Sequence, residues 1–323
     1  MLALVWDGAV NLREVPKPAP RPGEALVRVR LAGVCRTDLE VLRGYHGFRG
    51  VLGHEFIGVV EGPPASPRLG RRVVGEINLP CGACPRCRAG LGRHCLHRQV
   101  LGLKDRDGAF AEFLILPEEN LHLVPDGLSD EAAVFTEPLA AALAVAEAGA
   151  ISLRSRVLVV GDGALGLLTA MALAHAGTEV TLAGHYPERL RLAEPYGVAG
   201  FLEKDLPGQD FDVVVEAGGG PGGLDLALER VRPQGVVVLK STYAGRYHLD
   251  PAALVVPEVH LRGSRCGPFP AALRLLSGGS FDPRPLISAL LPFSLGVEAL
   301  DRASRKGILK VVLDMRPEPG KTP

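Results

Sequence analysis

The chain has 323 residues, more than one small hydrophobic core usually organises, so we expect two domains. Lysine plus arginine and aspartate plus glutamate both number 36, which gives a formal net charge of +0 at pH 7. This balance argues against nucleic acid or an anionic membrane as the main partner, because both attract proteins with a basic excess. Asp7 interrupts the short apolar start and the apolar stretch 163–178 contains His175, so we expect a cytoplasmic protein without signal peptide or membrane span.

Short strand-like runs fill the first third of the chain. They lie at 2–5, 25–32, 56–61, 72–75 and 111–116. Turn pairs such as Pro22-Gly23 separate them, as is typical of an irregular all-β unit. The sequence Ser129-Asp130-Glu131 then predicts the start of a helix, and alanine-rich segments follow it.

From Arg156 onward, strand-like and helix-like segments alternate, which predicts a parallel sheet covered on both faces. Strands are predicted at 157–160, 180–183, 212–216, 236–239 and 259–262, and helices at 164–176, 187–195 and 224–231. Between Phe201 and Phe211 the chain is too short and too broken by proline and glycine for a full crossover helix. Helices near 271–276 and 296–304 and a closing strand at 308–313 complete the pattern.

These patterns predict an α/β protein of two domains. Residues 1–140 with 266–323 are expected to form an irregular β-rich domain. Residues 141–265 are expected to form a doubly wound parallel sheet of the Rossmann type.

Four of the six cysteines share one short segment, at Cys81, Cys84, Cys87 and Cys95. In a chain without an export signal, clustered cysteines usually hold metal rather than form disulfides. Four thiolates suit a structural zinc ion, and the repeated Cys-x-x-Cys spacing leaves an iron–sulfur cluster as the alternative. We expect His94 and His97 at the surface, because four thiolates complete the shell, and Cys266, which has no motif partner, as an inert core thiol.

A second candidate metal site combines Cys35 with His54 and Glu55. A thiolate, a neutral imidazole and a carboxylate suit a catalytic zinc that keeps one position open for substrate. Taken alone, the cysteine and the histidine fit a core thiol and a loop histidine better than a metal site.

The segment Gly161-Asp162-Gly163-Ala164-Leu165-Gly166 follows a predicted strand and opens a predicted helix. There the glycines allow a tight turn, close approach of a pyrophosphate and close helix–strand packing, and the helix N-terminus receives the phosphate charge. We therefore predict a coenzyme site formed by Gly161, Gly163, Ala164, Leu165 and Gly166.

Together these features resemble the zinc-dependent medium-chain dehydrogenase/reductase family of alcohol, polyol, threonine and sugar dehydrogenases. The resemblance covers nearly the whole chain and rests on the segments 33–38, 53–55, 81–95, 108–112, 137–140, 161–166 and 310–313. It implies a GroES-like catalytic domain, two zinc ions per chain, a nicotinamide coenzyme, a small alcohol, polyol, sugar or amino-alcohol substrate, and a homodimer or homotetramer. A threonine- or cyclitol-type enzyme of the same family, or a non-catalytic nucleotide-binding relative, is the alternative.

By resemblance, Cys35 and His54 ligate the catalytic zinc. Glu137 occupies the position at which typical alcohol dehydrogenases carry a second cysteine, and a glutamate there is similar to the polyol, threonine and glucose dehydrogenase branch. In that branch Glu55, Glu137 and water share the remaining positions of the metal.

The resemblance also assigns residues around the reacting groups. Thr37 matches the hydroxyl residue that passes the substrate proton towards solvent, and Arg36 stands where some members contact the coenzyme pyrophosphate. The family often ends the proton relay with a histidine at the position of Glu40, so Glu40, His46 or water is expected to end it here.

Coenzyme choice departs from the NAD pattern. Gly184 takes the place at which an NAD-specific Rossmann fold carries an acidic residue for the ribose 2′-hydroxyl. A glycine there removes a charge that would repel a 2′-phosphate and leaves room for it, and His185 and Arg189 can donate hydrogen bonds to that phosphate. We therefore predict preference for NADP(H), with use of NAD(H) as the alternative, and expect Gly184→Asp to swing selectivity towards NAD(H).

Overall fold

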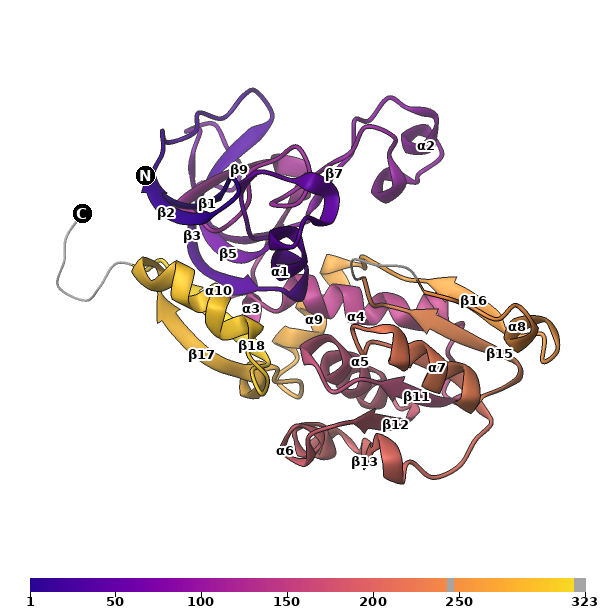
Figure 1. The fold of residues 1–323 in the computed structure, drawn as a ribbon. Coiled ribbons are helices and arrows are strands. Elements are labelled where there is room, and N and C mark those ends of the chain that lie inside the picture. The colour runs from indigo at the N-terminus through magenta and orange to yellow at the C-terminus, as the bar shows by residue number, and fades with distance from the viewer. Residues whose placement is uncertain (243–246, 317–323) are drawn as a thin grey trace. The chain divides into compact units, whose positions relative to one another are not determined.

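The computed structural model describes residues 1–242 and 247–316, and of His46 and Pro221 only the backbone. The chain divides into two compact units (Figure 1). Unit 1 comprises Met1–Glu137 and Leu273–Pro323, and unit 2 comprises Pro138–Ala272. The divisions fall in the first turn of α4 (Thr136–Ala148) and inside α9 (Phe269–Ser277), a few residues from the predicted boundaries after 140 and 265.

Unit 1 is an irregular β structure built on a seven-stranded sheet of order β10-β6-β5-β3-β18-β17, with β9 also paired to β3. These strands are β3 (Glu24–Val34), β5 (Glu55–Gly62), β6 (Arg72–Gly75), β9 (Phe113–Pro117), β10 (Leu121–Leu123), β17 (Ile287–Pro292) and β18 (Lys310–Asp314). Smaller sheets comprise β1 (Leu2–Trp6), β2 (Val10–Glu14) and β4 (Gly50–Val51), and β7 (Asn78–Leu79) with β8 (Gln99–Val100).

The central strand β3 organises this unit. Its 11 residues are mostly buried, as expected for a strand with neighbours on both sides. It pairs antiparallel with β5 along most of its length, with β9 at its start and with β18 at its end. The last pairing sets Val311 opposite Val34 and so brings the C-terminal part of the chain beside Cys35.

The helices of unit 1 are short and lie at its loops. They are α1 (Arg36–Leu42), α2 (Pro85–Arg88), α3 (Asp130–Ala133) and α10 (Gly296–Ser304). Ser129 caps α3 by accepting the backbone N–H of Ala132, which confirms the helix start predicted at that serine. Figure 1 shows that the segment around α2 stands out from the strands of unit 1.

Unit 2 is a six-stranded parallel sheet of order β13-β12-β11-β14-β15-β16. Its strands are β11 (Arg156–Val160), β12 (Glu179–Gly184), β13 (Ala199–Leu202), β14 (Phe211–Glu216), β15 (Val231–Leu239) and β16 (His260–Gly263). In chain order this is the 3-2-1-4-5-6 arrangement of a Rossmann fold, as predicted. The central strand β11 has its four valine and leucine positions fully buried, because helices cover both faces of such a sheet.

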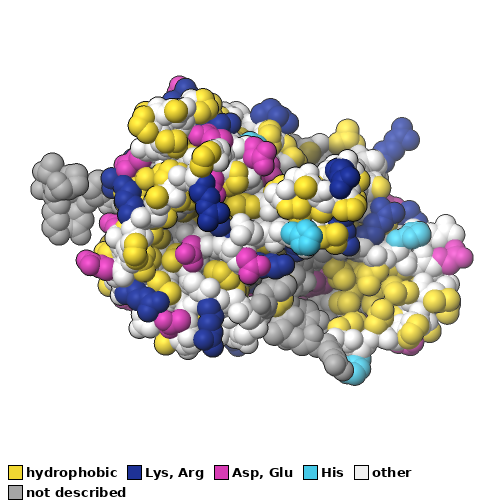
Figure 2. Space-filling model, turned by 90° about the horizontal axis from the view of Figure 1, so that it is seen from above, with side chains coloured by type: hydrophobic (Ala, Val, Ile, Leu, Met, Phe, Trp, Pro, Cys, Tyr) yellow, Lys and Arg dark blue, Asp and Glu magenta, His cyan; other side chains and the backbone are white. Residues whose placement is uncertain are grey.

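The crossovers of unit 2 contain the helices α5 (Ala164–His175), α6 (Pro187–Leu190), α7 (Pro221–Arg230) and α8 (Ala252–Val255). Between β13 and β14 the chain forms only a 3₁₀ turn at Glu203–Asp205, which confirms that this crossover lacks a full helix. In the described ranges, no helix combines the length and the apolar character needed to cross a bilayer. On the face drawn in Figure 2, basic and acidic side chains are interspersed, in keeping with the balanced charge.

Candidate functional site

Cys35 stands at the point where β3 ends and α1 begins. It is the N-cap of α1, with extended backbone angles (φ −97°, ψ 152°). Its backbone N–H donates to Oδ2 of Asp38, at 2.9 Å, so the carboxylate in the first helical turn fixes the strand–helix junction. Thr37 Oγ1 lies 3.6 Å from Cys35 Sγ, which places the predicted proton-accepting hydroxyl beside the thiol.

Asp38 also orients His54. Its second carboxylate oxygen, Oδ1, lies 3.1 Å from Nδ1 of His54, and the two residues are 0% and 3% exposed. An Nδ1–H that donates to Asp38 leaves Nε2 with a lone pair for a metal ion, which is a common arrangement of metal-binding histidines. Burial by itself lowers the pKa of His54, but the negative charges of Asp38 and Cys35 raise it well above its usual value.

Glu55 follows His54 at the start of β5 and forms a buried ion pair with Lys310 of β18. Lys310 Nζ lies 2.8 Å and 2.6 Å from the two carboxylate oxygens and also donates to the carbonyl of Val34, at 3.2 Å. Burial lowers the pKa of Lys310, but Glu55, Cys35 and Glu137 together more than offset this, so the net shift is upward. Gly33 is required here, because a Cβ at that position would lie 2.2 Å from Glu55 Oε2.

Cys35, His54 and Glu55 each offer one ligand atom, and these atoms all lie within 4.8 Å of one another. The carboxylates of Asp38, Glu55 and Glu137 and the thiol of Cys35 surround the site, and Lys310 pairs with Glu55. Acidic surroundings favour a divalent cation, and the donor set of thiolate, imidazole and carboxylate fits a zinc ion.

The other predicted site residues of unit 1 lie outside this three-residue group. Glu137 is half-buried in the first turn of α4 and contributes to the raised pKa of Lys310, so its charge acts on the same cluster. Its role as a ligand stays a prediction. Glu40 is 5% exposed and accepts a hydrogen bond from Arg43, at 2.6 Å, with Arg36 Nε at 3.7 Å. The side chain of His46 lies outside the described residues.

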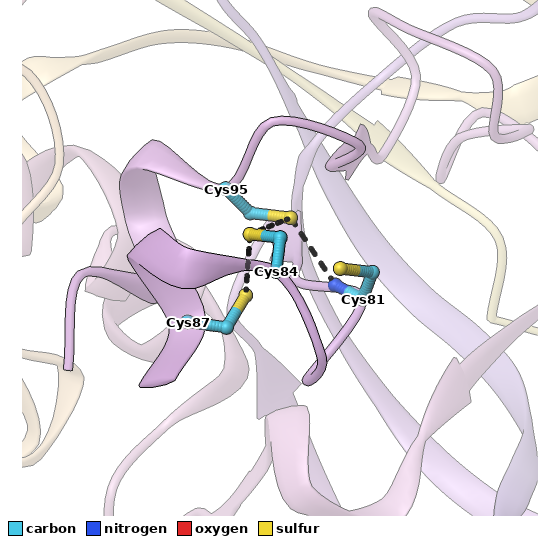
Figure 3. Close-up of side chains that lie close together, drawn as sticks. All are labelled: Cys81, Cys84, Cys87 and Cys95. Carbon is cyan, nitrogen blue, oxygen red and sulfur yellow. Dashed lines mark hydrogen bonds between the residues drawn. The ribbon is translucent and has the colours of Figure 1, made fainter. Parts of the chain in front are cut away.

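The four-cysteine segment forms one compact cluster (Figure 3). The sulfur atoms of Cys81, Cys84, Cys87 and Cys95 lie within 4.8 Å of one another, with Cys84 at 3.5 Å from Cys87 and 3.8 Å from Cys95. A tetrahedron with zinc–sulfur bonds of about 2.3 Å requires sulfur separations of roughly 3.8 Å, whereas a disulfide needs about 2.05 Å. An iron–sulfur cluster must hold several atoms between its cysteines and would spread them further apart. The spacing therefore fits a single zinc ion.

The surroundings of the cluster favour the thiolate at Cys84 and at Cys95 but not at Cys87. Backbone hydrogen bonds from Leu96 and Cys87 lower the pKa of Cys84 to about 6, whereas burial raises the pKa of Cys87 to about 12. The segment 81–98 contains four arginines and no acidic residue, so its positive charge opposes that of four thiolates around one zinc ion. Arg86 and Arg88 also donate to backbone carbonyls of the segment, which braces its loops.

In unit 2, the glycine motif lies between β11 and α5, where the sequence predicts it. Gly161 has φ +112°, and a Cβ there would approach the carbonyl oxygen of Ala217 to 2.6 Å. A Cβ at Gly166 would lie 1.9 Å from the carbonyl oxygen of Gly161. By contrast, nothing lies within 4 Å of a Cβ built on Gly163, the N-cap of α5. Gly161 and Gly166 thus allow close packing, and Gly163 leaves open space where a pyrophosphate would meet the helix N-terminus.

The structure fills the space expected beside Gly184, whereas the preference for NADP(H) stays a prediction. A Cβ there would lie 2.5 Å from Cβ and 2.8 Å from Oδ2 of Asp162, so the space is neither empty nor uncharged. Arg189 is only 11% exposed in its side chain, with Nη1 at 3.7 Å from Asp162 Oδ1. His185 is 67% exposed in its side chain, with Nε2 at 3.4 Å from Glu203. Gly184→Asp would therefore crowd a second carboxylate against Asp162, and we expect it to destabilise the strand end rather than to switch the coenzyme.

Comparison with known proteins shows the family of this chain. The alcohol dehydrogenase GroES-like domain model matches residues 21–126, and the zinc-binding dehydrogenase model matches residues 164–278. The erythritol/L-threitol dehydrogenase of Mycolicibacterium smegmatis is 31% identical, over 97% of each chain. The chain belongs to the zinc-dependent medium-chain dehydrogenase/reductase family.

Solved structures of the family superpose over almost the full length. The alcohol dehydrogenase RspB from Escherichia coli CFT073, in complex with NADH, is 28% identical, covers 98% of this chain and 99% of its own, and gives a TM-score of 0.89. A zinc-binding dehydrogenase from Sinorhizobium meliloti 1021, bound to NADP, is 28% identical, covers 97% and 98%, and gives 0.88. One neighbour thus holds NADH and another NADP.

Three charged residues of this family member were assigned no role from the sequence: Asp38, Asp162 and Lys310. Asp38 has a local signal, because an acidic residue in the first turn after a strand commonly binds the N-terminus of its helix. Asp162 lies inside the glycine motif, but its contact with the end of β12 is not local. Lys310 and Glu55 are 255 residues apart in sequence, so no sequence spacing connects them.

Zinc content and stability should separate the two metal sites. We expect Cys84→Ser to lose one zinc ion and to lower the midpoint of thermal unfolding by about 10 °C or more, because a structural zinc contributes folding free energy directly. Cys35→Ser should also lose one zinc ion and most activity, but should keep that midpoint within a few degrees. Elemental analysis and calorimetry measure both, with Cys266→Ser as the control. An iron chromophore, or zinc in only one site, would contradict the assignment.

Asp38 should set the tautomer of His54. Asp38→Asn still accepts the N–H of Cys35, but its amide can donate to Nδ1 of His54 and so place the imidazole proton on Nε2. We expect zinc affinity at the Cys35 site to fall about 10- to 100-fold while the fold is retained. Competition with a chelator measures this affinity, and the exposed Asp301→Asn serves as the control. Unchanged affinity would show that this contact does not orient the ligand.

Proposed function

We propose that this chain is a zinc-dependent dehydrogenase that transfers a hydride between the hydroxyl-bearing carbon of a small alcohol, polyol or sugar and a nicotinamide coenzyme. The observation that carries the proposal is the group of Cys35, His54 and Glu55, whose donor atoms lie within 4.8 Å of one another and fit a divalent cation. A protein that only binds nucleotides has no use for such a group, so the non-catalytic alternative is disfavoured.

Each bound group has its own residues. Cys35 and His54 would hold the catalytic zinc, with Glu55 and Glu137 available for the remaining position, and the four-cysteine cluster would hold the second ion. The segment 161–166 at the start of α5 would hold the coenzyme pyrophosphate. When bound, the catalytic zinc supplies Lewis acidity at the substrate oxygen, and the nicotinamide supplies the hydride chemistry.

The chain's own residues position the reactants and move the proton. Thr37 Oγ1, half-buried beside Cys35, would accept the proton of the substrate hydroxyl and pass it outwards. Asp38 keeps His54 oriented, and Lys310 keeps Glu55 from turning freely into the site. These contacts hold the donor atoms in place before substrate arrives, which reduces the reorganisation that the reaction requires.

A polar cavity supports a hydroxyl-rich substrate. It has a volume of about 290 Å³ and is lined by residues 47–49 and 103–107. Gly102 and Gly108 pack this loop directly against Gly53, the residue before His54. Charged side chains line most of the cavity, which favours polyols or sugars over apolar alcohols. The homo-oligomeric state, which the resemblance implies, and the cytoplasmic location, which is expected from the sequence, both stay predictions.

A substrate panel tests the proposal. Purified protein should oxidise at least one of a set of tetritols, pentitols, hexitols, their phosphates, aldoses, L-threonine and secondary alcohols when NAD and NADP are each supplied. Activity should disappear when a chelator removes the labile zinc, and should return when zinc is added. No turnover of any member, with zinc and coenzyme both bound, would revive the non-catalytic alternative.

Glu137 should tune the metal site rather than serve only for packing. We expect Glu137→Ala to lower turnover by well over about tenfold with little change in coenzyme affinity, because loss of a metal ligand or of its hydrogen-bonded support costs about 10- to 100-fold. Glu147→Ala, on the exposed side of the same helix, is the matched control. If the Glu137→Ala variant keeps both its activity and its zinc content, Glu137 does not act on the metal as it is expected to do in the polyol dehydrogenase branch.

A further inference from the structure

The carboxylate of Asp162 lies against the end of strand β12. Its Oδ2 atom accepts hydrogen bonds from the backbone N–H groups of His185, at 2.9 Å, and Tyr186, at 2.8 Å. Asp162 is 4% exposed, and Gly184 leaves just enough room for it. A larger residue at 184 would exclude this carboxylate, so Gly184 allows Asp162 of the glycine motif to lie against the end of β12.

This place matters for the coenzyme. In a doubly wound sheet, the end of the second strand and the glycine loop of the first crossover flank the adenosine ribose, and an acidic residue there binds the 2′-hydroxyl of NAD. Asp162 supplies a carboxylate at that edge from a different position in the sequence. The charge expected to be missing at Gly184 is present in the structure.

The basic residues expected to receive a 2′-phosphate each face a carboxylate. Arg189 lies 3.7 Å from Asp162 Oδ1, and its guanidinium carbon lies 4.3 Å from the centre of the Tyr186 ring. Because its side chain is only 11% exposed, a phosphate would have to displace Tyr186 or the ion pair to reach it. His185 lies 3.4 Å from Glu203, which adds a second negative charge near the same edge.

We propose that Asp162 determines coenzyme specificity by placing its carboxylate at the ribose-binding edge, and that the chain consequently prefers NAD(H) to NADP(H). The buried carboxylate acts through its charge: a 2′-phosphate brings negative charge towards Asp162 and Glu203, whereas the ribose hydroxyls of NAD(H) are uncharged. This inference rests on the proposed function as a dehydrogenase, and it reverses the preference expected from Gly184 alone.

Direct coenzyme binding tests the inference without turnover. Fluorescence titration of the purified, zinc-loaded protein should give a lower Kd for NADH than for NADPH. Asp162→Asn keeps an oxygen acceptor for the two backbone N–H groups and removes the charge, so it should bind NADPH at least about tenfold more tightly relative to NADH. Asp210→Asn, which removes the same charge from an exposed turn, should leave the ratio of the two Kd values unchanged.

A second variant does not depend on the backbone contacts of Asp162. Arg189→Gln removes the cation that offsets Asp162 and should raise the ratio of Kd for NADPH to Kd for NADH further. Tighter binding of NADPH by the unmodified protein would overturn the inference. So would a folded Asp162→Asn variant with an unchanged ratio, because Asp162 would then serve only to fix the loop. Binding of neither coenzyme would instead contradict the proposed function itself.

Discussion

Lys310 and Glu55 form a buried ion pair across the end of β3, and the rest of the candidate active site is arranged around it. Glu55 begins β5, Lys310 begins β18, and both strands pair with β3 just before Cys35. Removing one partner of such a pair typically costs about 3–5 kcal/mol, because the other charge stays buried without compensation. The last strand of the chain is therefore needed to keep the donor atoms of Cys35, His54 and Glu55 together.

A buried ion pair is weak evidence for stability, since an apolar pair of similar volume would often serve as well. Its value here lies in the position in which it holds Glu55. The pair itself is neutral, and the acidic groups around it, Asp38 and Glu137, favour a divalent cation at the donor atoms. Charge is also compensated in the four-cysteine segment, where the positive charge of the arginines opposes the negative charge of thiolates around a zinc ion.

In the Rossmann unit, a carboxylate lies at the end of strand β12, as in an NAD-binding fold, but Asp162 of the glycine loop supplies it. Gly161 and Gly166 let the backbone pack closely, and Gly163 leaves space at the start of α5. Gly184 looks like the loss of an acidic residue when strand β12 is considered alone. In the folded unit it makes room for Asp162, because a side chain at 184 and the Asp162 carboxylate compete for one volume.

The sequence by itself determined the features that depend on residues close together in the chain. These are the alternation of strands and helices that builds the parallel sheet, the glycine turn, the helix start at Ser129 and the spacing of the four cysteines. It also indicated Cys35 and His54 as a pair, through resemblance rather than through spacing. Only the tertiary structure decided that Lys310 meets Glu55, that Asp38 orients His54, and that Asp162 fills the space at Gly184. These contacts join separate strands and loops, and the energy of a buried charge depends on which partner the fold brings to it, which no local pattern encodes.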